Sequence, residues 1–182
     1  MFHAAPLPVA KRPGGVRIRQ LRAMALLGLA IPAVAWPKSS APPVLWNVSP
    51  SVPLGLYYML SRQPTAGALA VIRLPKPFLD LVTTRRYLPT GALLIKPVAA
   101  RTGDIVCRHH SIVAINGRAA AFARTADAFS RPLPKWNGCI RLNAAGAFVL
   151  SGEPDSFDSR YCGPLPLHRA LGVARALIVL PQ

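Results

Sequence analysis

Residues 152–163 read Gly-Glu-Pro-Asp-Ser-Phe-Asp-Ser-Arg-Tyr-Cys-Gly, and no other stretch of this 182-residue chain restricts its structure as strongly. The segment holds three of the six acidic residues of a chain that carries 22 lysines and arginines. We expect Asp158 and Arg160 to form a local ion pair that fixes the turn. The Ser156 hydroxyl would then be held where it can form hydrogen bonds with other segments. A solvated surface loop would also explain the polarity of this segment, taken alone.

A second informative segment, residues 49–55, reads Ser-Pro-Ser-Val-Pro-Leu-Gly. Ser51 follows Pro50 and precedes Pro53 by two residues. Because proline fixes one backbone dihedral, prolines on both sides would hold Ser51 in one geometry, as a nucleophile requires. An ordinary loop rich in serine and proline has the same composition.

Lys96 ends the apolar run of residues 92–95. A lysine at the end of an apolar strand usually extends its amine into solvent. If the amine is buried instead, desolvation lowers its pKa, by about 3–5 units at the extreme. A neutral Lys96 amine can accept the proton of Ser51, which is the serine–lysine variant of the catalytic triad.

Short runs of strand composition, separated by turn signals, predict a mostly-β domain over residues 47–182. The 20 prolines argue against long helices. The pair Asn116-Gly117 predicts a hairpin with a type I′ turn. Residues 75–90 are expected to form a short helix or a flap. The predicted strands span residues 55–60, 68–73, 91–96, 104–107, 111–115, 118–122, 147–150 and 173–180.

The three motifs occur in an order that resembles the type I signal peptidases. This order is Ser-x-Ser-x-Pro, then a lysine after apolar residues, then Gly-x-x-x-Ser-x-Asp-Ser-Arg-Tyr-x-Gly. Residues 47–57 resemble the TraF branch, the signal-peptidase-like proteases of conjugative plasmid transfer. The resemblance covers residues 45–180 and implies a signal-peptidase-like catalytic β domain that follows an N-terminal signal or anchor segment.

The resemblance implies a role for each motif residue. Ser51 is the nucleophile, and its backbone N–H contributes to the oxyanion hole. The hydroxyl of Ser49 completes that hole. Lys96 is the general base, and Ser156 orients it. The residues of the expected ion pair, Asp158 and its arginine partner, hold the turn together.

The function implied is that of a serine endopeptidase in a conjugative transfer system. Its partner and substrate is a pro-pilin or another polypeptide inserted in the membrane, which is cleaved through an acyl-enzyme without a cofactor or metal. No specific nucleic acid is expected as a partner. Either water releases the acyl group, or the terminal amine of the pilin attacks it and closes a cyclic subunit. Both outcomes are compatible with these residues.

Three alternatives remain. A general type I signal peptidase would hydrolyse export signals with the same residues. A serine–lysine autoprotease of the LexA kind would need an N-terminal DNA-binding domain, whereas residues 1–45 are rich in proline and resemble a signal. A non-enzymatic, basic nucleic-acid-binding component would use the net charge of +16. Its support is weak because the arginines are dispersed and not interleaved with aromatic residues.

The N-terminal region, residues 1–36, is expected to be an export signal or a membrane anchor. Five lysines and arginines precede the uncharged, apolar run of residues 23–35, a pattern typical of an export signal. Because positive flanks stay in the cytoplasm, we expect the domain at the periplasmic face of the bacterial inner membrane, or free in the periplasm after signal cleavage. Residues 37–46, rich in proline, are expected to form a linker.

Three cysteines fit an exported protein with one disulfide and one spare thiol. We expect the disulfide between Cys107 and Cys139, because Cys162 lies inside the polar turn. Three buried thiols remain an alternative. The sequence Cys107-Arg108-His109-His110 matches no common zinc pattern, so no metal site is expected.

Overall fold

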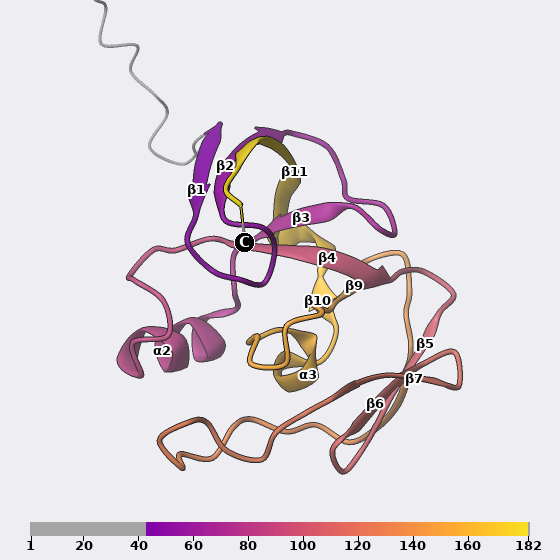
Figure 1. The fold of residues 1–182 in the computed structure, drawn as a ribbon. Helices are drawn as coiled ribbons and strands as arrows, with labels where there is room; N and C mark the ends of the chain where they lie inside the picture. Colours follow the sequence, from indigo (N-terminus) through magenta and orange to yellow (C-terminus); the bar gives the residue numbers. More distant parts are fainter. Residues whose placement is uncertain (1–42, 182) are drawn as a thin grey trace, which may run out of the picture. The chain divides into compact units, whose positions relative to one another are not determined.

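Two antiparallel sheets make up residues 43–181, the part of the chain that this computed structural model describes (Figure 1). The larger sheet has seven strands in the order β1-β2-β11-β3-β4-β9-β10. These strands are β1 (Val44–Asn47), β2 (Gly55–Leu60), β11 (Ala170–Val179), β3 (Leu69–Ile72), β4 (Leu94–Ala100), β9 (Gly146–Val149) and β10 (Leu165–Pro166). The smaller sheet has the order β7-β6-β5-β8. Its strands are β7 (Arg118–Phe122), β6 (Ile112–Ile115), β5 (Ile105–His109) and β8 (Gly138–Arg141).

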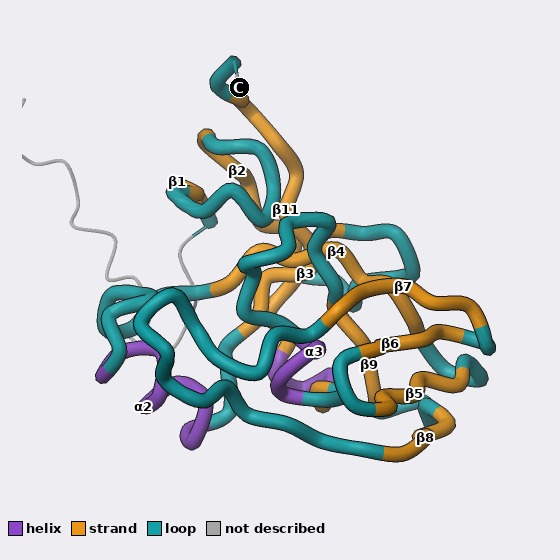
Figure 2. Tube along the Cα trace, turned by 60° about the horizontal axis from the view of Figure 1, so that its bottom comes forward, coloured by secondary structure: helices purple, strands orange, loops and turns teal. Residues whose placement is uncertain are grey.

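Helices are short in the described part of the chain (Figure 2). They are α2 (Lys76–Thr84), α3 (Ser159–Cys162) and a 3₁₀ turn at Leu167–Arg169. Figure 2 shows that loops join most of the strands and helices. The prediction of a mostly-β domain is confirmed.

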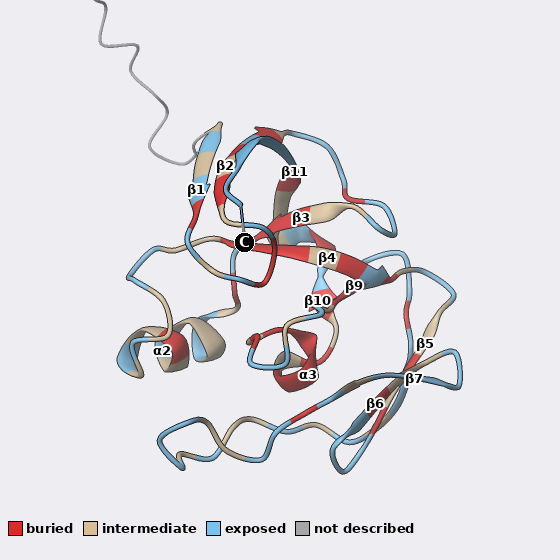
Figure 3. Cartoon of the chain, in the orientation of Figure 1, coloured by how far each residue is buried: buried red, intermediate tan, exposed pale blue. Residues whose placement is uncertain are grey.

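One apolar cluster joins the smaller sheet to the larger one. It contains Val106 of β5, Val113 of β6, Phe148 of β9 and Tyr161 of α3, all of them buried. Figure 3 shows α3 mostly in the colour of buried residues. Because burying apolar surface is the main favourable term in folding, this cluster holds α3, and with it the polar turn, between β9 and the smaller sheet.

Local sequence signals located several elements correctly. The strand predicted at residues 55–60 is β2, and the expected short helix is α2. Asn116 and Gly117 have φ values of 50° and 79°, and positive φ at both central residues is what a type I′ turn requires. The strand predicted at residues 91–96 is shifted, because β4 begins at Leu94 and continues through Pro97 to Ala100.

Four elements were not predicted from the sequence: β1, β8, β10 and α3. The expected linker, residues 37–46, extends too far. Residues 44–46 belong to β1, which pairs with β2 from Val44 opposite Tyr58 to Asn47 opposite Gly55. Leu45 packs against a buried cluster that includes Tyr57, which explains why this segment is a strand. The expected signal or anchor at residues 1–36 lies outside the described residues. None of the helices in residues 43–181 has the length and hydropathy to cross a bilayer.

Candidate active site

Ser51 lies in the loop between β1 and β2, and three side chains fix the backbone of that loop. Asn47 Nδ2 donates hydrogen bonds to three carbonyl oxygens of the loop, at 2.7, 3.0 and 3.1 Å. The Tyr57 hydroxyl donates to the Pro53 carbonyl at 2.7 Å. The Ser151 hydroxyl donates to the carbonyl of Ser51 itself at 2.8 Å. The loop is therefore held by hydrogen bonds as well as by its prolines.

Lys96 brings the three sequence motifs together. It lies on β4 opposite Ala70 of β3, and only 2% of its surface is exposed. Its Nζ donates hydrogen bonds to Ser51 Oγ and to Ser156 Oγ, which belong to segments 45 and 60 residues away in sequence. Ser51 Oγ lies 3.3 Å from Ser156 Oγ and 2.8 Å from Ser49 Oγ. An amine and three hydroxyls are thus clustered at one buried point.

Burial lowers the pKa of Lys96 to about 8 from its ordinary value of 10.5, because the charged form loses its hydration. The negative charge of Asp158 raises this pKa, while the positive charge of Arg160 lowers it. At a pH slightly above neutral, a substantial fraction of Lys96 is therefore an uncharged amine. An uncharged amine next to a serine hydroxyl can act as a proton acceptor.

The expected ion pair is present inside the turn and is almost fully buried. Arg160 Nη2 lies 2.9 Å from Asp158 Oδ2, with side-chain exposures of 2% and 0%. Asp158 also caps α3 by accepting from the backbone N–H of Arg160, and it accepts from the N–H of Ser151 at 3.0 Å. Arg160 donates to the carbonyl oxygens of Ser151, Glu153 and Pro154. The pair thus fixes the segment that carries Ser156.

Arg108 ties the turn to the smaller sheet, a contact that the sequence analysis did not predict. This buried side chain of β5 donates hydrogen bonds to the carbonyl oxygens of His110 and Pro134 at 3.0 and 3.4 Å, and to that of Arg160. Asn47 and Ser151 were missed in the same way. Only the fold reveals their roles, because their hydrogen-bond partners are main-chain atoms that leave no mark in the sequence.

The two groups that the sequence predicts as oxyanion donors lie beside Ser51 Oγ. The backbone N–H of Ser51 points to Ser49 Oγ at 3.4 Å. Both groups are hydrogen-bond donors, and the hydroxyl can rotate toward an oxygen that develops negative charge near Ser51 Oγ. The structure thus brings together Ser49, Ser51, Lys96 and Ser156.

A cavity of about 480 Å³ opens above this cluster. The nucleophile loop, Lys96 and residues 153–157 form one side, and residues 124–133 of the loop between β7 and β8 form the other. Arg124 ties this loop to Asp155 at 2.9 Å, and the Tyr87 hydroxyl donates to Asp127. A second cavity of about 280 Å³ lies between residues 45–49 and residues 88–96. Both cavities include Lys96 in their walls, so the cluster lies where they meet.

The cysteines occupy two different settings. Cys107 and Cys139 form a disulfide across β5 and β8, the pairing expected from the sequence. Cys162 keeps a free thiol within the described chain. Burial raises the pKa of Cys162 far above its ordinary value, which keeps this thiol protonated and unreactive as a nucleophile.

The motifs, in their order, indicate a protein of the signal peptidase class. The family described as "Signal peptidase, peptidase S26" matches residues 18–179, and the chain belongs to this family. It is 34% identical to the conjugal transfer protein TraF of Agrobacterium fabrum over 140 residues, which cover 71% of this chain and 78% of that protein. It is 29% identical to a plasmid transfer protein TraF of Escherichia coli over 144 residues, 72% of this chain and 81% of that protein.

Among solved structures, the chain resembles a signal peptidase I from Enterococcus faecalis. The two are 18% identical, with a TM-score of 0.35, over 62% of this chain and 97% of the other. A likeness at this level adds nothing to the family assignment, which rests on the sequence comparisons.

Replacing Lys96 with methionine should stabilise the protein at pH 7, because the folded state then no longer buries a charged amine. The pKa of Lys96 is about 8 in the folded state against an ordinary value of 10.5. Each unit of this difference corresponds to about 1.4 kcal/mol in the free energy of unfolding. The gain is therefore at most about 3 kcal/mol at pH 7. It should shrink as the pH rises from 8 to 10.5, where the unfolded state also loses its proton.

Urea unfolding of the wild type and Lys96→Met at pH 7 and at pH 10 measures this difference. A variant that is less stable than the wild type at pH 7, with a difference independent of pH, would contradict the burial of a destabilised charge at Lys96.

Proposed function

We propose that this protein is a serine endopeptidase of a conjugative transfer system. It processes a membrane-inserted pro-pilin through Ser51 as nucleophile and Lys96 as general base. The observation that carries the proposal is the buried Lys96 amine, which is hydrogen-bonded to the hydroxyls of both Ser51 and Ser156 at the base of a cleft. The names of the TraF relatives, a conjugal transfer protein and a plasmid transfer protein, support the setting.

The first chemical step is acylation of Ser51. Neutral Lys96 takes the proton of the Ser51 hydroxyl as Ser51 Oγ attacks the scissile carbonyl carbon. The oxyanion accepts hydrogen bonds from the Ser51 N–H and the Ser49 hydroxyl, each worth about 10²–10³ in rate. The protonated Lys96 then gives its proton to the leaving amine, so the lysine starts the next step neutral again.

The second step releases the acyl group. Lys96 removes a proton from the attacking nucleophile, which is either water or the free terminal amine of the same pilin chain, and gives it to Ser51 Oγ as the acyl bond to Ser51 breaks. Water yields a shortened linear product, whereas the amine yields a cyclic one. The Ser156 hydroxyl accepts a hydrogen bond from Lys96 Nζ and thereby keeps the amine aimed at Ser51 in both steps.

The shape of the cleft suits an extended polypeptide. The two cavities meet at Lys96 and together have about 760 Å³ of space. Ala92 and Leu93 border the smaller cavity and directly precede β4, so their backbone lies outside any named strand. An extended substrate can pair with such a segment through main-chain hydrogen bonds, which places its scissile carbonyl above Ser51.

The location that we propose is the periplasmic face of the inner membrane. β1, β2, β11 and the residues next to them expose a set of large apolar side chains close to the Ser51 loop, since Val179 of β11 pairs with Gly55, four residues beyond Ser51. Exposed apolar surface of this kind is typical of protein or membrane contact. Its members are Val44, Trp46, Val48, Tyr58, Leu177, Ile178, Val179 and Leu180.

Ser51→Ala should abolish processing without unfolding the protein, whereas Ser49→Ala should slow it about 10²–10³-fold, because one oxyanion donor is lost. The test is mass spectrometry of a candidate pilin co-expressed with each variant, with Ser61→Ala as a control at an exposed serine. Linear and cyclic products differ by the mass of one water. Normal processing by Ser51→Ala together with an inactive Ser49→Ala would show that the nucleophile is misassigned. A chain that binds DNA in a salt-dependent way and processes nothing would overturn the proposal.

The processing rate should rise about tenfold per pH unit below pH 8 and level off above it, because only neutral Lys96 accepts a proton. Lys96→Arg should be inactive, since a guanidinium stays protonated, while Lys135→Arg, at an exposed lysine, should match the wild type. The measurement is kcat/KM from about pH 6 to about pH 9.5. An active Lys96→Arg enzyme would rule out the general base.

A reporter fused to the C-terminus, of a kind that is active only after export, should be active and should sediment with the membranes. Residues 1–36 and the exposed apolar side chains of β1 and β11 both favour this location. An inactive, cytoplasmic reporter would refute export and with it pilin processing. An active reporter found only in the soluble fraction would refute the membrane association alone.

A further inference from the structure

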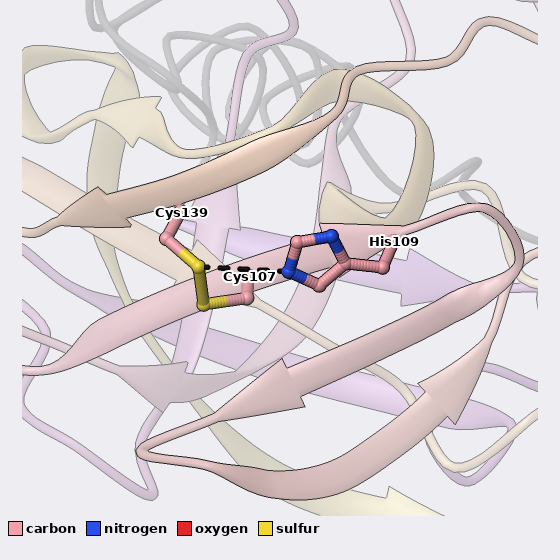
Figure 4. A group of neighbouring side chains, drawn as sticks. All are labelled: Cys107, His109 and Cys139. Carbon is pink, nitrogen blue, oxygen red and sulfur yellow. Dashed lines mark hydrogen bonds between the residues drawn. A yellow bond between two sulfur atoms is a disulfide. The ribbon is translucent and has the colours of Figure 1, made fainter.

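Cys107, His109 and Cys139 gather on the outer face of the smaller sheet, away from the cleft (Figure 4). Cys107 and His109 are two residues apart on β5, so their side chains point to the same face. The residues on either side of Cys107, Val106 and Arg108, point to the buried face. Cys139 lies directly opposite Cys107 on β8. Three potential metal ligands thus come from one strand and its neighbour.

The ligand atoms of this cluster are close enough to bind one ion. They all lie within 4.8 Å of one another, and His109 Nε2 is 3.8 Å from Cys139 Sγ. In a tetrahedral zinc site, Zn–S distances of about 2.3 Å and Zn–N distances of about 2.0–2.1 Å separate two ligand atoms by roughly 3.5–3.8 Å. The histidine and Cys139 therefore already have a spacing that suits zinc.

The disulfide and the ion would compete for the same two sulfur atoms. In the structure the two cysteines are joined, and a disulfide sulfur has no thiolate to offer a metal. His109 and Cys139 are exposed, and Cys107 is partly exposed, so a thiol reductant can approach from solvent. After reduction, two thiolates and one neutral imidazole supply three ligands, and the exposed side leaves a fourth position for water.

We propose that Cys107, Cys139 and His109 form a redox-gated Zn²⁺ site that is closed by the disulfide and opened by its reduction. A dithiol attacks one sulfur, forms a mixed disulfide and leaves as a cyclic disulfide, and its two electrons reduce the two cysteine sulfurs to thiols. Zn²⁺ then displaces the two thiol protons. The two thiolates cancel the charge of the ion. None of the three ligands lines the cleft.

The surroundings keep the three ligands in place without the disulfide. β5 and β8 pair at four positions, and β5 is also paired with β6 on its other side. Arg141, two residues after Cys139 on β8, donates a hydrogen bond to the carbonyl of Gly103 at 3.1 Å. The sequence spacing gave no sign of this site because the third ligand lies 32 residues from the first and reaches it only through strand pairing.

The test uses the full-length protein, oxidised or reduced with a trialkylphosphine, and Co²⁺ as a spectroscopic probe for Zn²⁺. The reduced protein should show thiolate-to-cobalt charge-transfer bands and tetrahedral ligand-field bands that Zn²⁺ abolishes, and the oxidised protein should show neither. His109→Ala should weaken binding more than about tenfold, since even outer-shell changes cost that much. His110→Asn is the matched control, because it changes the neighbouring histidine at a residue with a positive φ of 55° that asparagine accepts.

Three results would overturn the proposal. One is the absence of thiolate bands in the reduced protein. Another is a His109→Ala variant that binds Co²⁺ as tightly as the wild type does. In that case Cys162, or a pair of thiols outside an ordered site, would account for the bands. The third is loss of the β-sheet circular dichroism signal on reduction, because the site requires β5 and β8 to remain paired without the bond.

Discussion

The buried ion pair between Asp158 and Arg160 is the interaction on which the rest of the site depends. Removing two charges from water costs several kcal/mol per ion, and this is recovered only if the remaining hydrogen-bonding positions are satisfied. Other hydrogen bonds satisfy this pair, because Asp158 accepts from two backbone N–H groups and Arg160 donates to three carbonyl oxygens. One of the residues bound is Ser151, whose hydroxyl holds the carbonyl of Ser51. The pair therefore fixes both the turn that carries Ser156 and the loop that carries the nucleophile.

Much of the fold could be predicted from the sequence where an element depends on a few neighbouring residues. Strand composition bounded by turn residues located β2, and Asn116-Gly117 located its hairpin, because both depend on a few neighbouring residues. The missed strands are short, and pairing with distant segments makes them strands. The segment Val44–Asn47 shows this clearly, since it follows two prolines and becomes β1 only because β2 lies beside it.

The sequence predicted which residues form the candidate site, but it did not predict how they are arranged. The order of the motifs indicated Ser51, Lys96 and Ser156, which do meet in the structure, while their catalytic roles stay a prediction. Composition alone cannot tell whether a lysine that ends an apolar run is exposed or buried. The central position of β4 between β3 and β9 settles that question for Lys96. Asn47 escaped prediction because its side chain bonds only main-chain atoms, three carbonyl oxygens and the N–H of Ser49.

The strand order of the larger sheet has a consequence for biosynthesis. β11 lies between β2, which follows the nucleophile loop, and β3, which pairs with the strand of Lys96. The ribosome makes residues 170–179 after every other strand of the two sheets. Until they emerge, the two halves of the cleft have no strand between them to set their spacing. A chain that stops before β11 would contain Ser51 and Lys96 and yet lack the strand that joins their parts of the larger sheet.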